Sequence, residues 1–139
     1  MTYVAKPHWS FWVIAAMALI WNAMGAVNWV TQIAAPDLEA MPEWWREVVA
    51  SRPLWAVLAM AVAVFAGMLG AVLLLQRRQA AVLVFSVSLA GTVLAAGQAF
   101  GIGEPSPRQL FEAVLMPVAV AAFLIWYARR MLRRRSPHP

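Results

Sequence analysis

The first long apolar segment of the chain carries the side chains best suited to bind a ligand. At about 100° per residue, three amides, two indoles and a glycine share roughly a third of one helix face. These residues are Trp21, Asn22, Gly25, Asn28, Trp29 and Gln32. Polar groups in hydrocarbon are costly unless they find partners, so this face should meet protein or a cavity.

The face has two interpretations. Amides in membrane bundles often hold helices together by hydrogen bonds, with Gln98, Ser88 or Thr92 as candidate partners here. Alternatively, the amides could hydrogen-bond the hydroxyls of a ligand while the indoles cover a flat ring or the C–H face of a sugar. The sequence leaves both open.

Glu112 is the only acid inside a long apolar segment. It lies about five residues into the last segment, roughly 7–8 Å from its start. The carboxylate could reach the outer interface or favour the helix N-terminus. It could also face the bundle at the depth of Asn28 and Gln32, where an ionisable group suggests a functional site.

The chemistry of most enzymes is missing. There is no cysteine, and His8 and His138 lie near the ends of the chain, outside every apolar segment. We therefore predict no catalytic residue, no metal site and no cofactor, and do not expect an enzyme. The acids of the longest connection are irregularly spaced and indicate a solvated surface rather than a calcium loop. They are Asp37, Glu39, Glu43 and Glu47.

The composition is that of a membrane protein. Of 139 residues, 63% are hydrophobic and 12% are charged, and the mean hydropathy is +0.70. A soluble domain has about 25% charged residues. A membrane-spanning helix needs about 20 mainly apolar residues. Four segments qualify, which predicts one all-α membrane domain, a four-transmembrane-helix bundle over residues 1–139 that ends in a basic tail, 128–139. The spans are 11–31, 54–75, 80–100 and 110–127.

The distribution of basic residues predicts the orientation. Eight lie on one side: Lys6, Arg77, Arg78, Arg129, Arg130, Arg133, Arg134 and Arg135. Three lie on the other side: Arg46, Arg52 and Arg108. The positive-inside rule then places both termini in the cytoplasm, with the protein in a bacterial inner membrane. The arginines that flank the spans favour anionic lipid head groups as partners, rather than nucleic acid.

Residues 42–49 predict a short helix in the outer connection, with an acidic start and with Trp45, Val48 and Val49 at helical spacing. It could be an interfacial helix that lies on the membrane surface, or a lid over a cavity.

Three other signals mark the joints between spans. Pro53 opens the second helix, Gln76–Gln79 makes a tight turn, and the Ser106-Pro107 pair with Gln109 forms a capping box. Pro117 should kink the fourth helix.

Small residues predict which helices pack closely. In the second and third spans they recur at helical spacing, which should let these spans approach closely. The four-residue turn between the two spans makes them antiparallel neighbours. The packing residues are Gly25, Ala59, Ala63, Gly67, Gly70, Ser88, Gly91 and Thr92. Packing within one chain is our interpretation, and a homodimer through one of these faces is the alternative.

Several motifs carry a resemblance to a known family. They are Trp21-Asn22-x-Met24-Gly25, Pro53-x-Trp55-Ala56, Gly67-x-x-Gly70, Leu73-Leu74-Leu75 before Arg77, and Ser88-Leu89. Over roughly residues 10–100 the chain resembles small four-helix bacterial membrane proteins that are often labelled as sugar transporters. The resemblance implies a transport role. In size the chain also resembles the small multidrug resistance transporters, but those carry an essential glutamate in the first helix, where this chain has no acid.

We therefore expect the binding or transport of a small polar solute, sugar-like by the family label. Trp21, Asn22, Asn28, Trp29 and Gln32 would line the site, with Glu112 as a coupling or orienting acid. Four helices make a thin wall, so transport would require a dimer. The rival is an accessory or scaffold protein whose amides only hold the bundle, and an intramembrane enzyme is a third reading. A cavity that touches both Asn28 and Glu112 would favour binding, and a packed interior with every amide paired would favour the scaffold.

Overall fold

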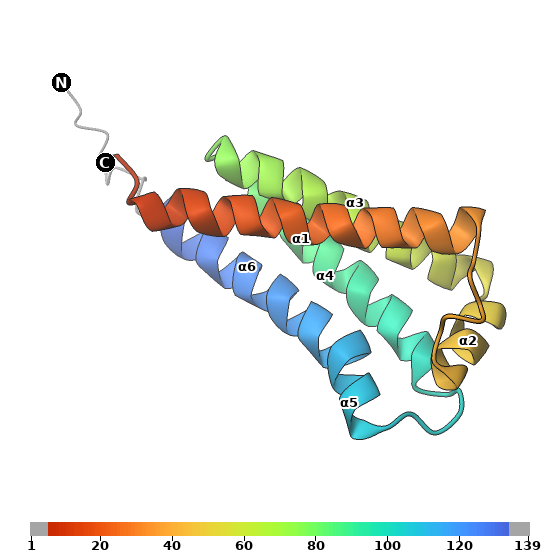
Figure 1. Cartoon of the computed structure of the whole chain (residues 1–139). Helices are drawn as coiled ribbons and strands as arrows, with labels where there is room; N and C mark the ends of the chain where they lie inside the picture. Colours follow the sequence, from red (N-terminus) through yellow and green to blue (C-terminus); the bar gives the residue numbers. More distant parts are fainter. Residues whose placement is uncertain (1–5, 134–139) are drawn as a thin grey trace.

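The chain forms a four-helix membrane bundle with a short helix between the first two spans (Figure 1). The computed structural model describes residues 6–133, which contain no β-strand. The elements are α1 (Trp9–Ala34), α2 (Glu43–Ala50), α3 (Leu54–Leu75), α4 (Ala80–Ala99), α5 (Pro107–Leu110), the π-helical turn η1 (Phe111–Leu115) and α6 (Met116–Arg133). Four helices are long and apolar enough to cross a membrane, the last running from Pro107 through η1 to Arg133. The predicted fold class is confirmed.

The helix ends follow the predicted signals closely. Ser106 caps α5: its hydroxyl accepts from the backbone N–H of Gln109 at 3.3 Å, and the Gln109 side chain accepts from the Ser106 N–H at 2.9 Å. Pro42 is the N-cap of α2, so the helix begins at Glu43, one residue later than predicted. The fourth span continues to Arg133, while Arg134, Arg135 and the last four residues lie outside the described residues.

The predicted turn between α3 and α4 is a tight left-handed cap. Arg77 adopts a φ of 60°, and the Arg78 N–H donates to the Leu73 carbonyl at 2.9 Å. This geometry satisfies carbonyls at the end of α3 and reverses the chain at once. The two helices therefore pack side by side and antiparallel.

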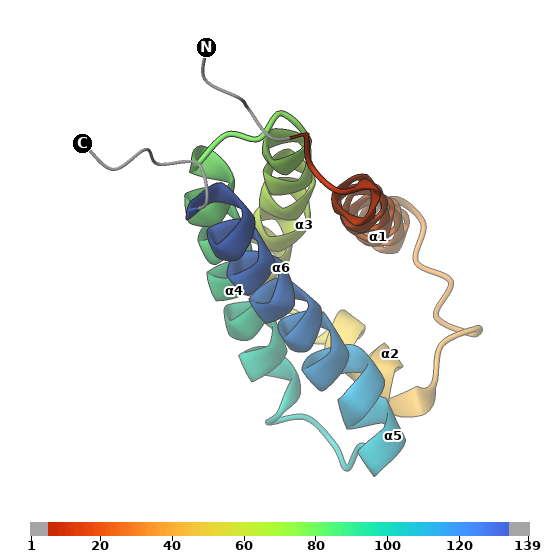
Figure 2. The same cartoon turned by 90° about the vertical axis from the view of Figure 1, so that its left-hand side faces the viewer.

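The α3–α4 pair forms the centre of the bundle (Figures 1 and 2). The α1 helix packs against α3, and α6 packs against α4. In Figure 1 the start of α1 and the end of α6 lie together, and the two helices then diverge toward the end that carries α2 and α5. The bundle is therefore closed at one end and splayed at the other.

Aromatic and aliphatic side chains from all four spans close the first end. The ring of Phe11 stacks on that of Tyr127 with centroids 6.4 Å apart. Phe85 and Leu74 are almost fully buried beside them. The remaining buried members of this core are Ala15, Ala18, Ala71, Ala81, Leu124, Ala128 and Leu132.

Small residues let α3 and α4 approach within backbone contact. A Cβ at Gly91 would lie 2.7 Å from the Ala59 carbonyl oxygen and 2.9 Å from the Ala63 nitrogen. One turn away, the Ser88 hydroxyl donates to the Ala63 carbonyl at 2.6 Å. Gly70 gives room to the Phe85 ring in the same way. At Gly25 on α1, by contrast, a Cβ would meet only Val64 at an ordinary 3.5 Å, so close packing does not require that glycine.

The disturbance caused by Pro117 lies in the turn before it. Residues Phe111–Leu115 form a π-helical turn, in which the Met116 N–H bonds to the Phe111 carbonyl. Proline has no N–H, and its ring crowds the carbonyl four residues earlier, here that of Ala113. The extra residue in the wider turn accommodates this conflict. The extra residue also rotates Pro107–Leu115 about the helix axis, and so changes which of their side chains face the bundle.

Substitution of Gly91 by alanine should separate α3 from α4. Because the new methyl group would meet backbone atoms, which cannot rotate away, we expect G91A to lower the free energy of unfolding by about 1–3 kcal/mol. Reversible unfolding in mixed micelles, followed by circular dichroism, measures this change.

The matched control is Gly97 on the same helix, where a Cβ would meet nothing within 4 Å. G97A should be neutral or stabilising by up to about 1 kcal/mol, since alanine is the better helix former. Equal stability of the two variants would contradict the assigned contact between α3 and α4.

Candidate ligand-binding cavity

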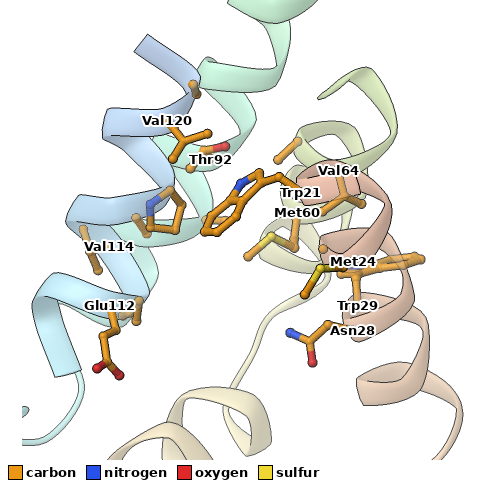
Figure 3. A pocket seen from close by; sticks show the side chains of 18 of the residues that line it. Trp21, Met24, Asn28, Trp29, Met60, Val64, Thr92, Glu112, Val114 and Val120 are labelled. Carbon is orange, nitrogen blue, oxygen red and sulfur yellow. The ribbon is translucent and has the colours of Figure 1, made fainter. Parts of the chain in front are cut away.

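The divergence of α1 and α6 leaves a cavity of about 710 Å³ in the open half of the bundle (Figure 3). Its walls come from α1, α3, α4, α5, η1 and α6, and residues of α2 lie at its outer end. This volume is in the range of small-molecule sites. The cavity touches both Asn28 and Glu112, which is the arrangement expected to favour binding over a fully packed scaffold.

Residues of α1 form one wall. The indole of Trp21 reaches across the space toward α6, and Met24 and Asn28 follow along the same helix (Figure 3). The amide of Asn28 makes no side-chain hydrogen bond within residues 6–133, so both its donors and its acceptor are available.

Asn22 lies elsewhere. Its amide donates to the Ala18 carbonyl of its own helix at 2.8 Å, and its oxygen packs against Gly67 of α3. A methyl group at Gly67 would collide with that oxygen. Asn22 does not line the cavity. The predicted stripe is thus divided: Asn22 helps to seat α1 on α3, while Trp21 and Asn28 face the cavity.

Gln32 lines the outer end of the cavity, and its partner is a residue the sequence analysis did not select. The Arg52 guanidinium donates to the Gln32 side-chain oxygen at 3.3 Å and lies over the ring of Trp45, 5.7 Å from its centroid. Burial lowers the pKa of Arg52 below its ordinary value. Its place just before the second span marks it as a basic outer residue, but nothing in the pattern pairs it with Gln32, twenty residues away.

Glu112 lies on the wall opposite Asn28, at the mouth of the cavity (Figure 3). The carboxylate accepts a hydrogen bond from the Arg108 guanidinium at 2.8 Å, one turn earlier in the chain. The side chains of Arg108 and Glu112 are 86% and 56% exposed, so this ion pair is weak and open to exchange. Glu112 thus borders the cavity, while its carboxylate accepts a hydrogen bond from an exposed arginine.

The deeper part of the cavity is apolar. Its lining there includes Met60, Val64, Phe85, Val120 and Leu124. Two hydroxyls reach this part of the cavity, and both already donate a hydrogen bond to a backbone carbonyl. Ser88 donates to Ala63, and Thr92 donates to the Ser88 carbonyl at 2.9 Å. Polar groups with free capacity therefore concentrate at the outer end.

The α2 helix covers part of that outer end and turns its apolar face to protein. Trp44 and Val48 are buried against Ala99 of α4, and Trp45 borders the cavity. The Trp44 indole N–H donates to the Ile102 carbonyl at 2.8 Å, and the Gln98 amide donates to the Val48 carbonyl at 3.4 Å. These contacts favour the lid over a helix that rests on lipid alone.

Trp29 borders the cavity but engages α3. Its ring meets that of Phe65 edge to face, with centroids 5.7 Å apart. The indole nitrogen is buried without a hydrogen-bond partner within the described residues. Trp29 therefore contributes mainly to the seating of α1 on α3.

Comparison with known proteins does not indicate a function for the chain. No family model, curated protein or solved structure matches the chain. The resemblance to the four-helix family labelled as sugar transporters stays a prediction. Within residues 6–133, no three histidine, aspartate or glutamate side chains gather closely enough to hold a metal ion.

The contacts of α2 predict how firmly it closes the cavity. Trp44→Phe removes the indole donor to Ile102 but keeps an aromatic ring in place. A hydrogen bond contributes about 1 kcal/mol, so amide hydrogen exchange over Glu43–Ala50 should accelerate about five-fold.

Trp45→Phe is the control, because the Trp45 indole nitrogen makes no hydrogen bond within the described residues. It should leave exchange in α2 nearly unchanged. If the two variants behaved alike, the Trp44–Ile102 bond would not be what holds α2 closed.

Proposed function

We propose that this multi-pass membrane protein binds a small amphiphile within the bundle, with the apolar part deep and the polar group at the outer end. The carrying observation is the polarity gradient along one cavity. Apolar side chains of α3, α4 and α6 line its depth, while Asn28, Gln32 and Glu112 lie toward the mouth. Ligand sites in proteins have this composition, with mostly apolar walls and a few placed polar groups.

A hydroxyl-rich sugar is less well matched than an amphiphile. The deep hydroxyls of Ser88 and Thr92 already donate hydrogen bonds to backbone carbonyls, and Asn22 faces α3. A sugar seated there would leave several hydroxyls without partners, which costs free energy for each buried group. A sugar ring stacked on Trp21 is the form in which the predicted solute remains compatible with the cavity.

The cavity lies within one chain, so binding needs no second copy. Transport would further require that access alternate between the two ends. The α2 helix covers one end and the aromatic core closes the other. We therefore keep transport, and a homodimer to support it, as extensions of binding.

The orientation proposed from the sequence agrees with the arrangement of the helices. The start of α1, the α3–α4 turn and the end of α6 share the closed end (Figure 1). We propose that this end faces the cytoplasm of a bacterium, from its inner membrane. The guanidinium of Arg130 lies over the Trp126 ring at 5.4 Å, beside Arg129 and Arg133. These arginines, with Arg77 and Arg78, would contact anionic lipid head groups.

A scaffold role is the second candidate, and specific contacts support it. Of the bundle's amides, Asn22 bonds its own helix against α3, Gln32 accepts from Arg52 and Gln98 donates to α2. In this reading the cavity is filled by lipid and Asn28 has no special partner.

Binding of the neutral amphiphilic dye N-phenyl-1-naphthylamine to protein in nanodiscs tests the proposal. Ala121 lines the cavity from α6, whereas its neighbour Ala122 is exposed on the outer face. Ala121→Trp should fill the cavity and weaken the saturable binding at least about ten-fold, a change of about 1.4 kcal/mol. Dye emission, excited where tryptophan does not absorb, reports the bound fraction.

Ala122→Trp places the same indole on the lipid side and should leave binding unchanged. If the wild-type chain showed no saturable binding, or if the two variants bound the dye equally, the scaffold role would be supported instead. Empty nanodiscs supply the baseline for dye that only enters lipid.

A further inference from the structure

We propose that the ligand of this cavity is a cation with an apolar body, such as a lipophilic amine or a quaternary ammonium or phosphonium ion. This inference rests on the proposed amphiphile binding and assigns the charge of the polar group. Its basis is that one acidic residue and several tryptophans line a single cavity, which opens toward the acidic end of the bundle.

The indoles supply the first part of the argument. Trp21 reaches into the cavity from α1, and Trp44 and Trp45 border its outer end from α2. An indole face attracts a cation within about 6 Å, and more strongly where water is excluded. The protein already uses this attraction, since the Arg52 guanidinium lies 5.7 Å from the centroid of Trp45.

The carboxylate supplies the second part. Glu112 is the only acid that lines the cavity. Its present partner is the guanidinium of Arg108, at the end of a long and highly exposed side chain. An exposed ion pair of this kind contributes little. A cation that brings its apolar body out of water could therefore take the place of Arg108 on the carboxylate.

The charge around the mouth points the same way. All six acids of the chain lie in the outer connections, in α2 or at Glu112, against three arginines there, so this end carries a net charge of −3. Such a field concentrates cations and repels anions. Within residues 6–133, two arginines contact residues that line the cavity. The guanidinium of Arg52 is engaged by Gln32 and Trp45, and that of Arg108 by Glu112.

Tetraphenylphosphonium and tetraphenylborate make a matched pair for the test, because they share shape and apolar surface and differ in the sign of the charge. Each is titrated into protein in uncharged nanodiscs, and saturable quenching of tryptophan emission is measured against empty nanodiscs. We expect one saturable site per chain for the phosphonium and none for the borate.

Two variants change the carboxylate in opposite directions. Glu112→Gln should weaken phosphonium binding about ten-fold, whereas Arg108→Gln should tighten it, because the carboxylate then has no competing cation. Glu104→Gln removes an acid that lies in the loop before α5, outside the cavity lining, and should change binding less than two-fold. The opposite signs exclude a simple loss of folding, and the melting temperature of each variant confirms this.

The outcomes separate the two proposals. Equal affinity for the two ions, preference for the borate, or Glu112→Gln and Glu104→Gln of equal effect would overturn the assignment of a cation. Saturable binding of the neutral dye would survive any of these results. If neither ion nor the neutral dye bound saturably, both the cation assignment and amphiphile binding would fail.

Discussion

The close approach of α3 and α4 is the constraint on which the rest of the structure depends. Gly91 meets the backbone of the opposite helix, and Ser88 hydrogen-bonds across to Ala63. In lipid, helices gain no hydrophobic free energy from each other, so such small-residue contacts and hydrogen bonds decide which helices pair. The pair then forms a frame: α1 packs on one member and α6 on the other. Because the outer helices join only at the closed end, their divergence leaves a cavity between them.

The cavity combines two features that would each be costly without the other. Polar side chains at membrane depth need partners, and an empty apolar space forfeits packing. The proposed amphiphile would resolve both, because its apolar part would fill the depth while its polar group met Asn28 and Glu112. The π-helical turn before Pro117 belongs to the same design, since it carries Glu112 and Ala113 on the wall of the cavity.

Much of the fold could be predicted from the sequence. Apolar length located the ends of the first three spans to within three residues and those of the fourth to within six. Residue types located the capping box at Ser106 and the turn at Arg77. These signals are local, so they depend little on how the helices pack against one another. The site was harder. A helical wheel places Asn22 near Trp21, but it does not say that α3 would occupy the Asn22 side and leave Trp21 facing a cavity.

Contacts between segments distant in the sequence could not be predicted from the residue pattern for the same reason. The pairing of Arg52 with Gln32, the burial of Trp44 beneath Ile102 and the π-helical turn all follow from where helices meet. Glu112 and Asn28 were placed at matching depths by residue counting, and the cavity does touch both.

The splay between α1 and α6 is the central claim, and spin-label distances test it most directly in a chain that has no native cysteine. Labels at the exposed positions 12 and 126 report the closed end, and labels at the exposed positions 27 and 115 report the open end. The account predicts a clearly longer distance for the second pair, in nanodiscs and without added ligand. Equal distances at the two ends would mean parallel helices with no cavity between them, and would contradict it.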